Sequence, residues 1–183
     1  HSDRAAHPEH GSLHKPIHTS IAFEYADARD LAAVFQGRKN GYNYGRQQNP
    51  TVNALQNRIT RMEQGLTTVA FATGMAAIGS ILFALLRQGD HVVASSFLFG
   101  NTNSLFNTFT NFGVEVSFVD ATAAGNVQAA VKSNTRLVFV ETIANPATQV
   151  ADLQGIGALC SELGLIYVVD NTITTPWLFS PKS

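Results

Sequence analysis

The chain has 183 residues, of which 45% are hydrophobic and 14% are charged, and its net charge is −1. It is long enough for a domain with its own core and too apolar to be disordered. The charge gives no reason to expect nucleic acid or a membrane surface as a partner, and the longest apolar run, residues 78–86, cannot span a bilayer. One cysteine excludes an internal disulfide framework and favours a reducing, cytoplasmic compartment.

Helices and strands are expected to alternate along most of the chain, after an arm of short elements in residues 1–50. The expected elements, in order, are helix 51–62 capped by Thr51, strand 67–71, helix 75–88, strand 91–95, a helix through 105–112 ended by Gly113, strand 114–119, helix 126–132, strand 136–140, a helix between Asp152 and Gly164 with a buried face of Ile156, Leu159, Cys160 and Leu163, and strand 165–169. Because the strands are almost continuously apolar, the pattern predicts an α/β fold of three layers, with a mainly parallel sheet covered on both faces.

Ligands bind at the carboxyl ends of the strands in such sheets, so the residues after each strand are candidates for a site. In "VAFATGMAAIGSILFALL" a strand runs through Thr73 and Gly74 directly into a helix. The free N–H groups and the dipole at this helix start favour an anion such as phosphate, although glycine is also common at such turns for steric reasons alone. The sequence has no G-x-G-x-x-G or Walker pattern, which disfavours a Rossmann-type nucleotide binder.

Two tyrosines and an arginine alternate in "GYNYGRQQNPT". If this segment is extended, Tyr42, Tyr44 and Arg46 share one face, because strand side chains repeat every two residues. A phenol beside a guanidinium can clamp a phosphate monoester. The alternative is a polar loop that leads into the next helix.

Two further residues follow strands. Phe99, next to Gly100, can cover a flat ligand or pack in the core. Asp170 ends a buried strand with no lysine or arginine within ten residues on either side. It either caps a turn through Asn171 or Thr172, or pairs with a cation such as a protonated heteroaromatic nitrogen. Together with the anion site and the clamp, these residues describe an aromatic cation that carries a phosphate, as in pyridoxal 5′-phosphate (PLP).

The segments "YNYGRQQNPT", "FATGMAAI", "FGNT", "VETIANPATQVADL" and "VVDNTITTP" occur in the order seen in the Cys/Met-metabolism family of fold-type I PLP-dependent enzymes, which the chain resembles from about His14 to Pro181. This family includes cystathionine γ-synthase, cystathionine γ-lyase, methionine γ-lyase and the O-acylhomoserine sulfhydrylases. The resemblance implies the large domain of the aminotransferase-like PLP-dependent transferase fold, incomplete in this chain. Residues 1–50 would form an N-terminal arm and inter-subunit segment, residues 51–183 part of the PLP-binding large domain, and the C-terminal domain would be absent from this chain.

The resemblance assigns four residues to the cofactor phosphate. Tyr44 and Arg46 resemble the pair that reaches the phosphate bound by a neighbouring protomer. Gly74 and Met75 resemble the backbone donors to the protomer's own phosphate. The first pair implies a homo-oligomer, which in this family is a tetramer built from active dimers.

The resemblance assigns a second group of residues to the cofactor ring. Phe99 takes the stacking position, Asn145 lies near the ring hydroxyl with Glu141 as support, and Asp170 pairs with the pyridinium nitrogen. Phe99 departs from the usual tyrosine, because phenylalanine can stack but cannot donate a proton. Asn101 stands where methionine γ-lyases tend to carry cysteine, which favours a sulfhydrylase or synthase over a methionine-degrading lyase.

The family's Schiff-base lysine is expected beyond Ser183, in a Ser-x-Thr-Lys string. Lys182 lacks this context, and the remaining lysines lack any supporting motif: Lys15, Lys39 and Lys132. We therefore expect no catalytic residue in this chain, which would be the front part of a longer polypeptide and inactive alone.

The activity that the resemblance implies is PLP-dependent γ-replacement on an O-acyl-homoserine by sulfide or a thiol, which gives homocysteine or cystathionine in methionine biosynthesis. A C–S γ-lyase acting on methionine or cystathionine is the alternative within the family, and a catalytically dead fragment is the rival outside it. No metal site is expected. His10, His14 and His18 have helical spacing, but Gly11 and Pro16 interrupt any helix there.

Overall fold

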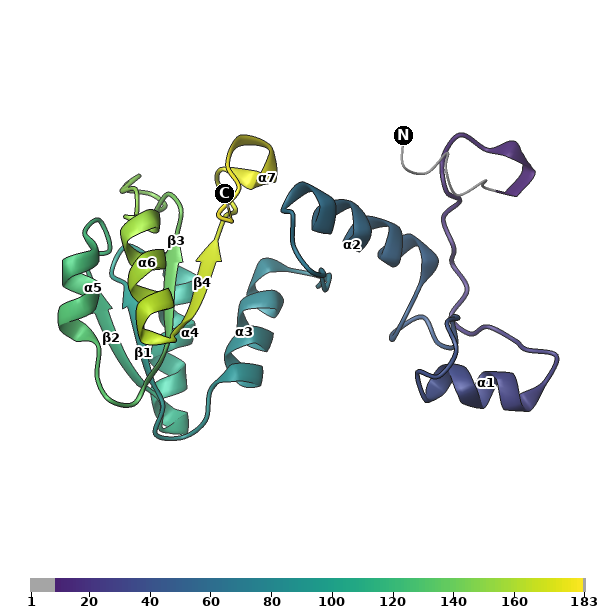
Figure 1. The fold of residues 1–183 in the computed structure, drawn as a ribbon, viewed down its shortest axis with the longest axis horizontal. Helices are drawn as coiled ribbons and strands as arrows, with labels where there is room; N and C mark the ends of the chain where they lie inside the picture. The colour runs from purple at the N-terminus through teal and green to yellow at the C-terminus, as the bar shows by residue number, and fades with distance from the viewer. Residues whose placement is uncertain (1–8, 183) are drawn as a thin grey trace. The chain divides into compact units, whose positions relative to one another are not determined.

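The structure is a computed structural model that describes residues 9–182 (Figure 1). The chain forms two compact units, with the boundary between Ala70 and Phe71. The first unit contains the 3₁₀ helix η2 (Glu9–Gly11) and helices α1 (Ala28–Phe35) and α2 (Pro50–Met62). The second contains a sheet and the remaining helices.

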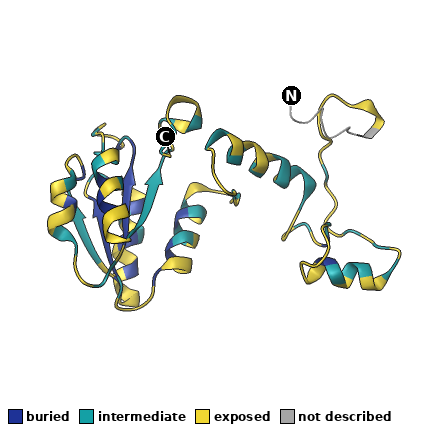
Figure 2. Ribbon diagram, in the orientation of Figure 1, coloured by how far each residue is buried: buried dark blue, intermediate teal, exposed yellow. Residues whose placement is uncertain are grey.

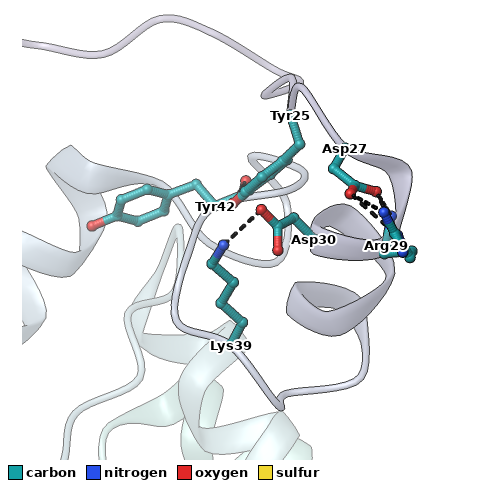
Figure 3. A network of polar contacts seen from close by, with 6 residues as sticks. All are labelled: Tyr25, Asp27, Arg29, Asp30, Lys39 and Tyr42. Atoms are coloured by element: carbon teal, nitrogen blue, oxygen red, sulfur yellow. Dashed lines mark hydrogen bonds and ion pairs between the residues drawn. The ribbon is translucent and has the colours of Figure 1, made fainter.

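Polar contacts tie α1 to the segments around it (Figure 3). Asp27 caps the helix by accepting a backbone N–H of the first turn (2.8 Å). Lys39, which follows the helix, forms an ion pair with Asp30 (Nζ–Oδ2 2.8 Å), and the Tyr25 hydroxyl donates to the Tyr42 carbonyl oxygen (2.9 Å). These polar contacts hold a unit in which few of the described residues are buried.

Helix α2 confirms the predicted helix 51–62, but the predicted N-cap is wrong. The cap is Asn49, whose Oδ1 accepts the N–H of Thr51 (2.8 Å) and that of Val52 (3.4 Å). A proline occupies the first helical position, where no N–H is needed. The capping residue therefore precedes the proline, and Thr51 lies inside the helix.

The second unit is built on a sheet of four parallel strands in the order β2-β1-β3-β4. The strands are β1 (His91–Ser95), β2 (Glu115–Val119), β3 (Thr135–Glu141) and β4 (Ile166–Asp170). The helices are α3 (Gly74–Leu85), α4 (Gly100–Phe109), η3 (Thr110–Phe112), α5 (Ala124–Ala130), α6 (Leu153–Leu163) and α7 (Thr175–Leu178). The predicted alternation and the predicted parallel sheet are both confirmed.

Two apolar cores lie on opposite faces of this sheet, because successive strand residues point to opposite sides. Figure 2 shows buried residues along the strands and on the helices beside them. Val92 and Phe139 belong to the core under α3 and α4, whereas Val93 and Val138 belong to the core under α5 and α6. All four side chains are at most 1% exposed. The structure therefore has the three layers predicted from the sequence.

The predicted ends of two helices are confirmed. Gly113 (φ 78°) and Gly164 (φ 65°) follow η3 and α6 in the left-handed conformation that residues with a Cβ disfavour. Asp152 caps α6 by accepting the N–H of Gly155 (3.0 Å). Leu163, expected on the buried face, is 45% exposed because it is the last helical residue, directly before the turn.

Residues 67–71, which were expected to form a strand, do not form one. No strand in residues 9–182 pairs with them, and Val69 and Phe71 are 67% and 44% exposed. A strand exists only where its backbone groups find a ladder partner, and an apolar composition alone does not supply one. The short helix α7 was not predicted.

Candidate functional site

The carboxyl ends of β3 and β4 and the first turns of α3 and α4 enclose a cavity of about 340 Å³ in the second unit. The predicted site residues that line it are Gly74, Met75, Phe99, Glu141, Asn145 and Asp170. These residues are far apart in sequence. The parallel topology brings the ends of β1, β3 and β4 to one edge of the sheet, and the first turn of α3, which follows no strand, lines the same cavity.

Two carboxylates stand side by side at this edge. Glu141 ends β3, Asp170 ends β4, and the two are paired in register. Residues in register on neighbouring parallel strands share a face, and Phe139 and Val168, two residues earlier, belong to the core under α3 and α4. Both carboxylates therefore lie on that face of the sheet, where the cavity is.

The first turn of α3 presents free backbone donors to the cavity. Thr73 caps the helix, with its hydroxyl accepting the N–H of Ala76 (3.1 Å). The N–H groups of Gly74 and Met75 have no acceptor within residues 9–182. A Cβ placed on Gly74 would meet no atom within 4 Å, so the space beside this turn is open. This turn is suited to an anion.

Asp170 fills one of the two roles that the sequence left open and has an oxygen available for the other. Its Oδ1 accepts the backbone N–H (3.0 Å) and the hydroxyl (2.5 Å) of Thr172, which is a turn cap. Its Oδ2 has no donor in the described part of the chain. Asp120, at the end of β2, caps Thr122 through the same two bonds (2.9 and 2.6 Å) but does not line the cavity. Capping therefore accounts for one oxygen of Asp170 and leaves the other available to a ligand.

Glu141 is 9% exposed, and its Oε1 accepts the backbone N–H of Phe99 (2.8 Å). Burial raises the pKa of the Glu141 carboxyl, and the charge of Asp170 acts in the same direction. The N–H groups of Phe99 and Asn145 oppose this shift by favouring the ionised form. The Phe99 ring itself is 45% exposed and lies on the cavity wall.

The lining of the cavity has no cationic side chain. Two carboxylates line the cavity, and none of its lining residues is a lysine, an arginine or a histidine. A carboxylate with an unpaired oxygen at a half-buried site favours a cationic ligand group, while the α3 turn on the cavity wall favours an anionic one.

Comparisons with known proteins identify the family of the chain. A model of the family described as Cys/Met metabolism PLP-dependent enzyme matches residues 1–182. The chain belongs to this family. It is 38% identical over 174 residues to an L-methionine gamma-lyase of Fusobacterium nucleatum, and 36% identical over 179 residues to an O-succinylhomoserine sulfhydrylase of Pseudomonas aeruginosa. These matches cover 94% and 97% of the chain, but 44% of each relative.

Solved structures of the family have the same fold. The crystal structure of metB from Corynebacterium glutamicum matches with a TM-score of 0.87 at 35% identity, over 95% of this chain and 44% of that one. A structure of metY from Campylobacter jejuni matches with a TM-score of 0.87 at 31% identity, over 93% of this chain and 43% of that one, and it contains N′-pyridoxyl-lysine-5′-monophosphate. The chain thus spans less than half the length of these relatives.

The cavity fits the cofactor of the family at both of its ends. Asp170 Oδ2 is free for a protonated ring nitrogen, and the N–H groups of Gly74 and Met75 are free for a phosphate. The exposed ring of Phe99 lies on the cavity wall, where it can stack on a flat ring. No lysine lines the cavity. The contact of each residue with PLP stays a prediction.

Tyr44 and Arg46 belong to the first unit and form a pair there. The Arg46 guanidinium carbon lies 5.0 Å from the centre of the Tyr44 ring, a cation–π contact. An antiparallel bridge between Ala22 and Tyr44 holds the backbone at this point. Of the three side chains expected to share one face, Tyr44 and Arg46 are thus close together, whereas the Tyr42 ring packs against Phe23 (5.5 Å between ring centres). The role of Tyr44 and Arg46 at a phosphate stays a prediction.

Sequence reasoning missed several lining residues: Thr102, Ile143, Thr172 and Ile173. Thr172 was named only as a turn partner of Asp170, which it is. Nothing in the sequence placed Thr102 near Met75, to whose sulfur its hydroxyl donates (4.0 Å). The residues 9–182 contain no group of three His, Cys, Asp or Glu side chains that could hold a metal ion. No helix among them is long and apolar enough to cross a bilayer.

Proposed function

We propose that this chain is the cofactor-binding part of an enzyme that carries out PLP-dependent γ-replacement on an O-acyl-homoserine. Sulfide or a thiol would be the second substrate, and homocysteine or cystathionine the product. The observation that supports this proposal is a cavity with two carboxylates, no cationic side chain and a free helix N-terminus, in a chain of this family. The charges of PLP complement that cavity.

Each of the predicted site residues has a defined task in this proposal. The N–H groups of Gly74 and Met75 bind the phosphate, and Tyr44 with Arg46 binds the phosphate of a neighbouring protomer. Phe99 covers one face of the ring, and Asn145 lies at the ring hydroxyl. Together these contacts would fix the position of the cofactor in the cavity and exclude water from one side of the ring.

The central task belongs to Asp170. Its Oδ2 would accept a hydrogen bond from the ring nitrogen and hold the proton there, because a carboxylate within bonding distance stabilises a cation. PLP, when bound, supplies an electron-accepting ring for the electron pair left when an amino acid loses its Cα proton. Phe99 has no proton to give, so proton transfers at the substrate fall to other groups, among them a lysine that does not line this cavity.

The remaining expectations concern assembly. We propose that residues 1–50 form an arm between subunits, that residues 51–183 form part of the large domain, and that the assembly is a tetramer of active dimers in the cytoplasm.

An assay on protein isolated from its source cells tests the proposal. The intact mass is measured first, because the 183 residues alone have a mass of 19.7 kDa. The preparation is then given PLP and either O-acetyl- or O-succinyl-L-homoserine with sulfide, and homocysteine is measured. A polypeptide near twice 19.7 kDa is expected to form homocysteine, and one of 19.7 kDa is expected to be inactive.

A second assay on the same preparation distinguishes γ-replacement from γ-elimination. The same preparation is given L-methionine without sulfide, and 2-oxobutyrate is measured. Homocysteine formation that exceeds 2-oxobutyrate formation by ~10-fold or more supports γ-replacement. The reverse ratio would assign the protein to the γ-lyases instead.

A further inference from the structure

The first turn of α4 is held by a residue from another element. Phe99 is the N-cap of α4, and no side chain caps this helix. The Phe99 N–H instead donates to Oε1 of Glu141, at the end of β3 and 42 residues away in sequence (2.8 Å). The backbone of Phe99 is thus bonded to a buried carboxylate, while its ring is exposed on the cavity wall.

We propose that Glu141 is a positioning residue that acts on the ligand through Phe99. Its carboxylate holds the Phe99 backbone, and this bond places the Phe99 ring over the ligand. Glu141 itself does not contact the ligand. The proposal deepens the function proposed above and rests on it, since it assumes a flat, cationic ligand in the cavity.

Because of the charges around Glu141, the strength of its hydrogen bond to Phe99 depends on whether a ligand is bound. Asp170, its neighbour in register, repels the ionised form, and no cationic side chain lines the cavity to offset this repulsion. The ionised form of Glu141 is favoured by the N–H groups of Phe99 and Asn145. It is also favoured by the positive end of the α4 dipole. A ligand cation beside Asp170 would remove the repulsion. The ionised form of Glu141 would then be favoured, and its bond to the Phe99 N–H would be stronger when the cavity is filled than when it is empty.

Binding of pyridoxamine 5′-phosphate to the 183-residue chain provides the first test. This ligand has the ring and the phosphate of PLP but no aldehyde that could react with surface lysines. Glu141→Ala is expected to weaken binding ~10-fold, since it removes a charge-assisted hydrogen bond. Glu141→Gln, which keeps an acceptor oxygen, is expected to weaken it less than ~3-fold. The matched control is Asp120→Ala, which removes a strand-end carboxylate outside the cavity and is expected to leave the affinity unchanged.

A double-mutant cycle with Phe99→Ala decides whether Glu141 acts through the ring. If it does, Glu141→Ala has no further effect on affinity in the Phe99→Ala background. If Glu141 contacts the ligand directly, the two losses multiply, and the proposal is overturned. The melting temperature of each variant shows whether it keeps the fold. If Glu141→Ala does not fold, Glu141→Gln replaces it in the cycle.

The second test needs no ligand. The amide proton of Phe99 is followed by NMR during an acid titration of the free chain. Its shift is expected to titrate with a midpoint above the ordinary glutamate value of 4.5, to stop titrating in Glu141→Gln, and to titrate at a lower pH in Asp170→Asn. If the Phe99 amide proton titrates in Glu141→Gln as it does in the wild type, the proposal is overturned. A titrating amide in a chain that binds no pyridoxamine 5′-phosphate would uphold the link and refute the proposed function.

Discussion

A buried histidine makes the stability of the second unit depend on pH. His91, the first residue of β1, has no exposed surface. Its Nδ1 lies 2.7 Å from the Thr135 hydroxyl on β3, and its Nε2 lies 2.9 Å from the Ser117 hydroxyl on β2. Hydroxyl groups can both donate and accept, and the Thr135 hydroxyl also accepts the N–H of Lys132 (2.7 Å). These contacts pair both ring nitrogens of a neutral imidazole in either tautomer.

Acid is the perturbation that tests this network. Burial lowers the pKa of His91, the charge of Lys132 acts in the same direction, and Glu115 opposes it. The unfolded chain therefore takes up a proton near the ordinary value of 6.5, at which the folded chain does not. Stability is unaffected by His91 above that pH. Below it, stability falls by ~1.4 kcal/mol per pH unit, until the folded pKa is reached.

The assay is urea unfolding followed by circular dichroism, from about pH 8 to about pH 5. His91→Gln is the comparison, because glutamine has an acceptor and a donor for the same two hydroxyls but does not titrate. We expect the wild-type free energy of unfolding to fall below pH 6.5 and that of His91→Gln to change little. Equal slopes in the two proteins would refute the neutral, buried histidine.

Two further predictions concern stability. Phe106 is fully buried, with its ring centre 5.2 Å from that of Phe139, so Phe106→Ala is expected to cost ~3–5 kcal/mol in urea unfolding, and a loss below ~1 kcal/mol would contradict the packing described. Asp152 accepts the N–H of Gly155 at the start of α6 and that of Ala124 at the start of α5. Asp152→Ala is therefore expected to lower the free energy of unfolding by ~1–2 kcal/mol, and Asp152→Asn by about half of that. If both variants are as stable as the wild type, the carboxylate does not join the two helices.

The parts of the fold that were predictable are those set by neighbouring residues. The strands, the helix ends at Gly113 and Gly164 and the cap at Asp152 follow from short apolar runs and from the few residue types that end helices. The strand expected at 67–71 depended on a pairing partner, which no local pattern reveals. The cap at Asn49 was readable from the proline that follows it.

The site was predictable at the level of which residues gather, and less so in their contacts. The rule that ligands bind at the carboxyl ends of parallel strands led to the residues at the ends of β3 and β4. The bond from Phe99 to Glu141 joins residues 42 positions apart, and only the register of the sheet and the start of α4 bring them together. The turn cap at Asp170 and its free oxygen coexist, although the sequence presented them as alternatives.

The measurement that tests the account most directly compares two aspartates. Asp170 and Asp120 cap their turns through the same pair of bonds, and only Asp170 lines the cavity. Both are changed to asparagine, which keeps an acceptor for the cap, and the affinity of each chain for pyridoxamine 5′-phosphate is measured. Asp170→Asn is expected to weaken binding by at least ~10-fold, while Asp120→Asn leaves it unchanged. Equal affinities in the two variants would contradict the pairing of Asp170 with a ring cation.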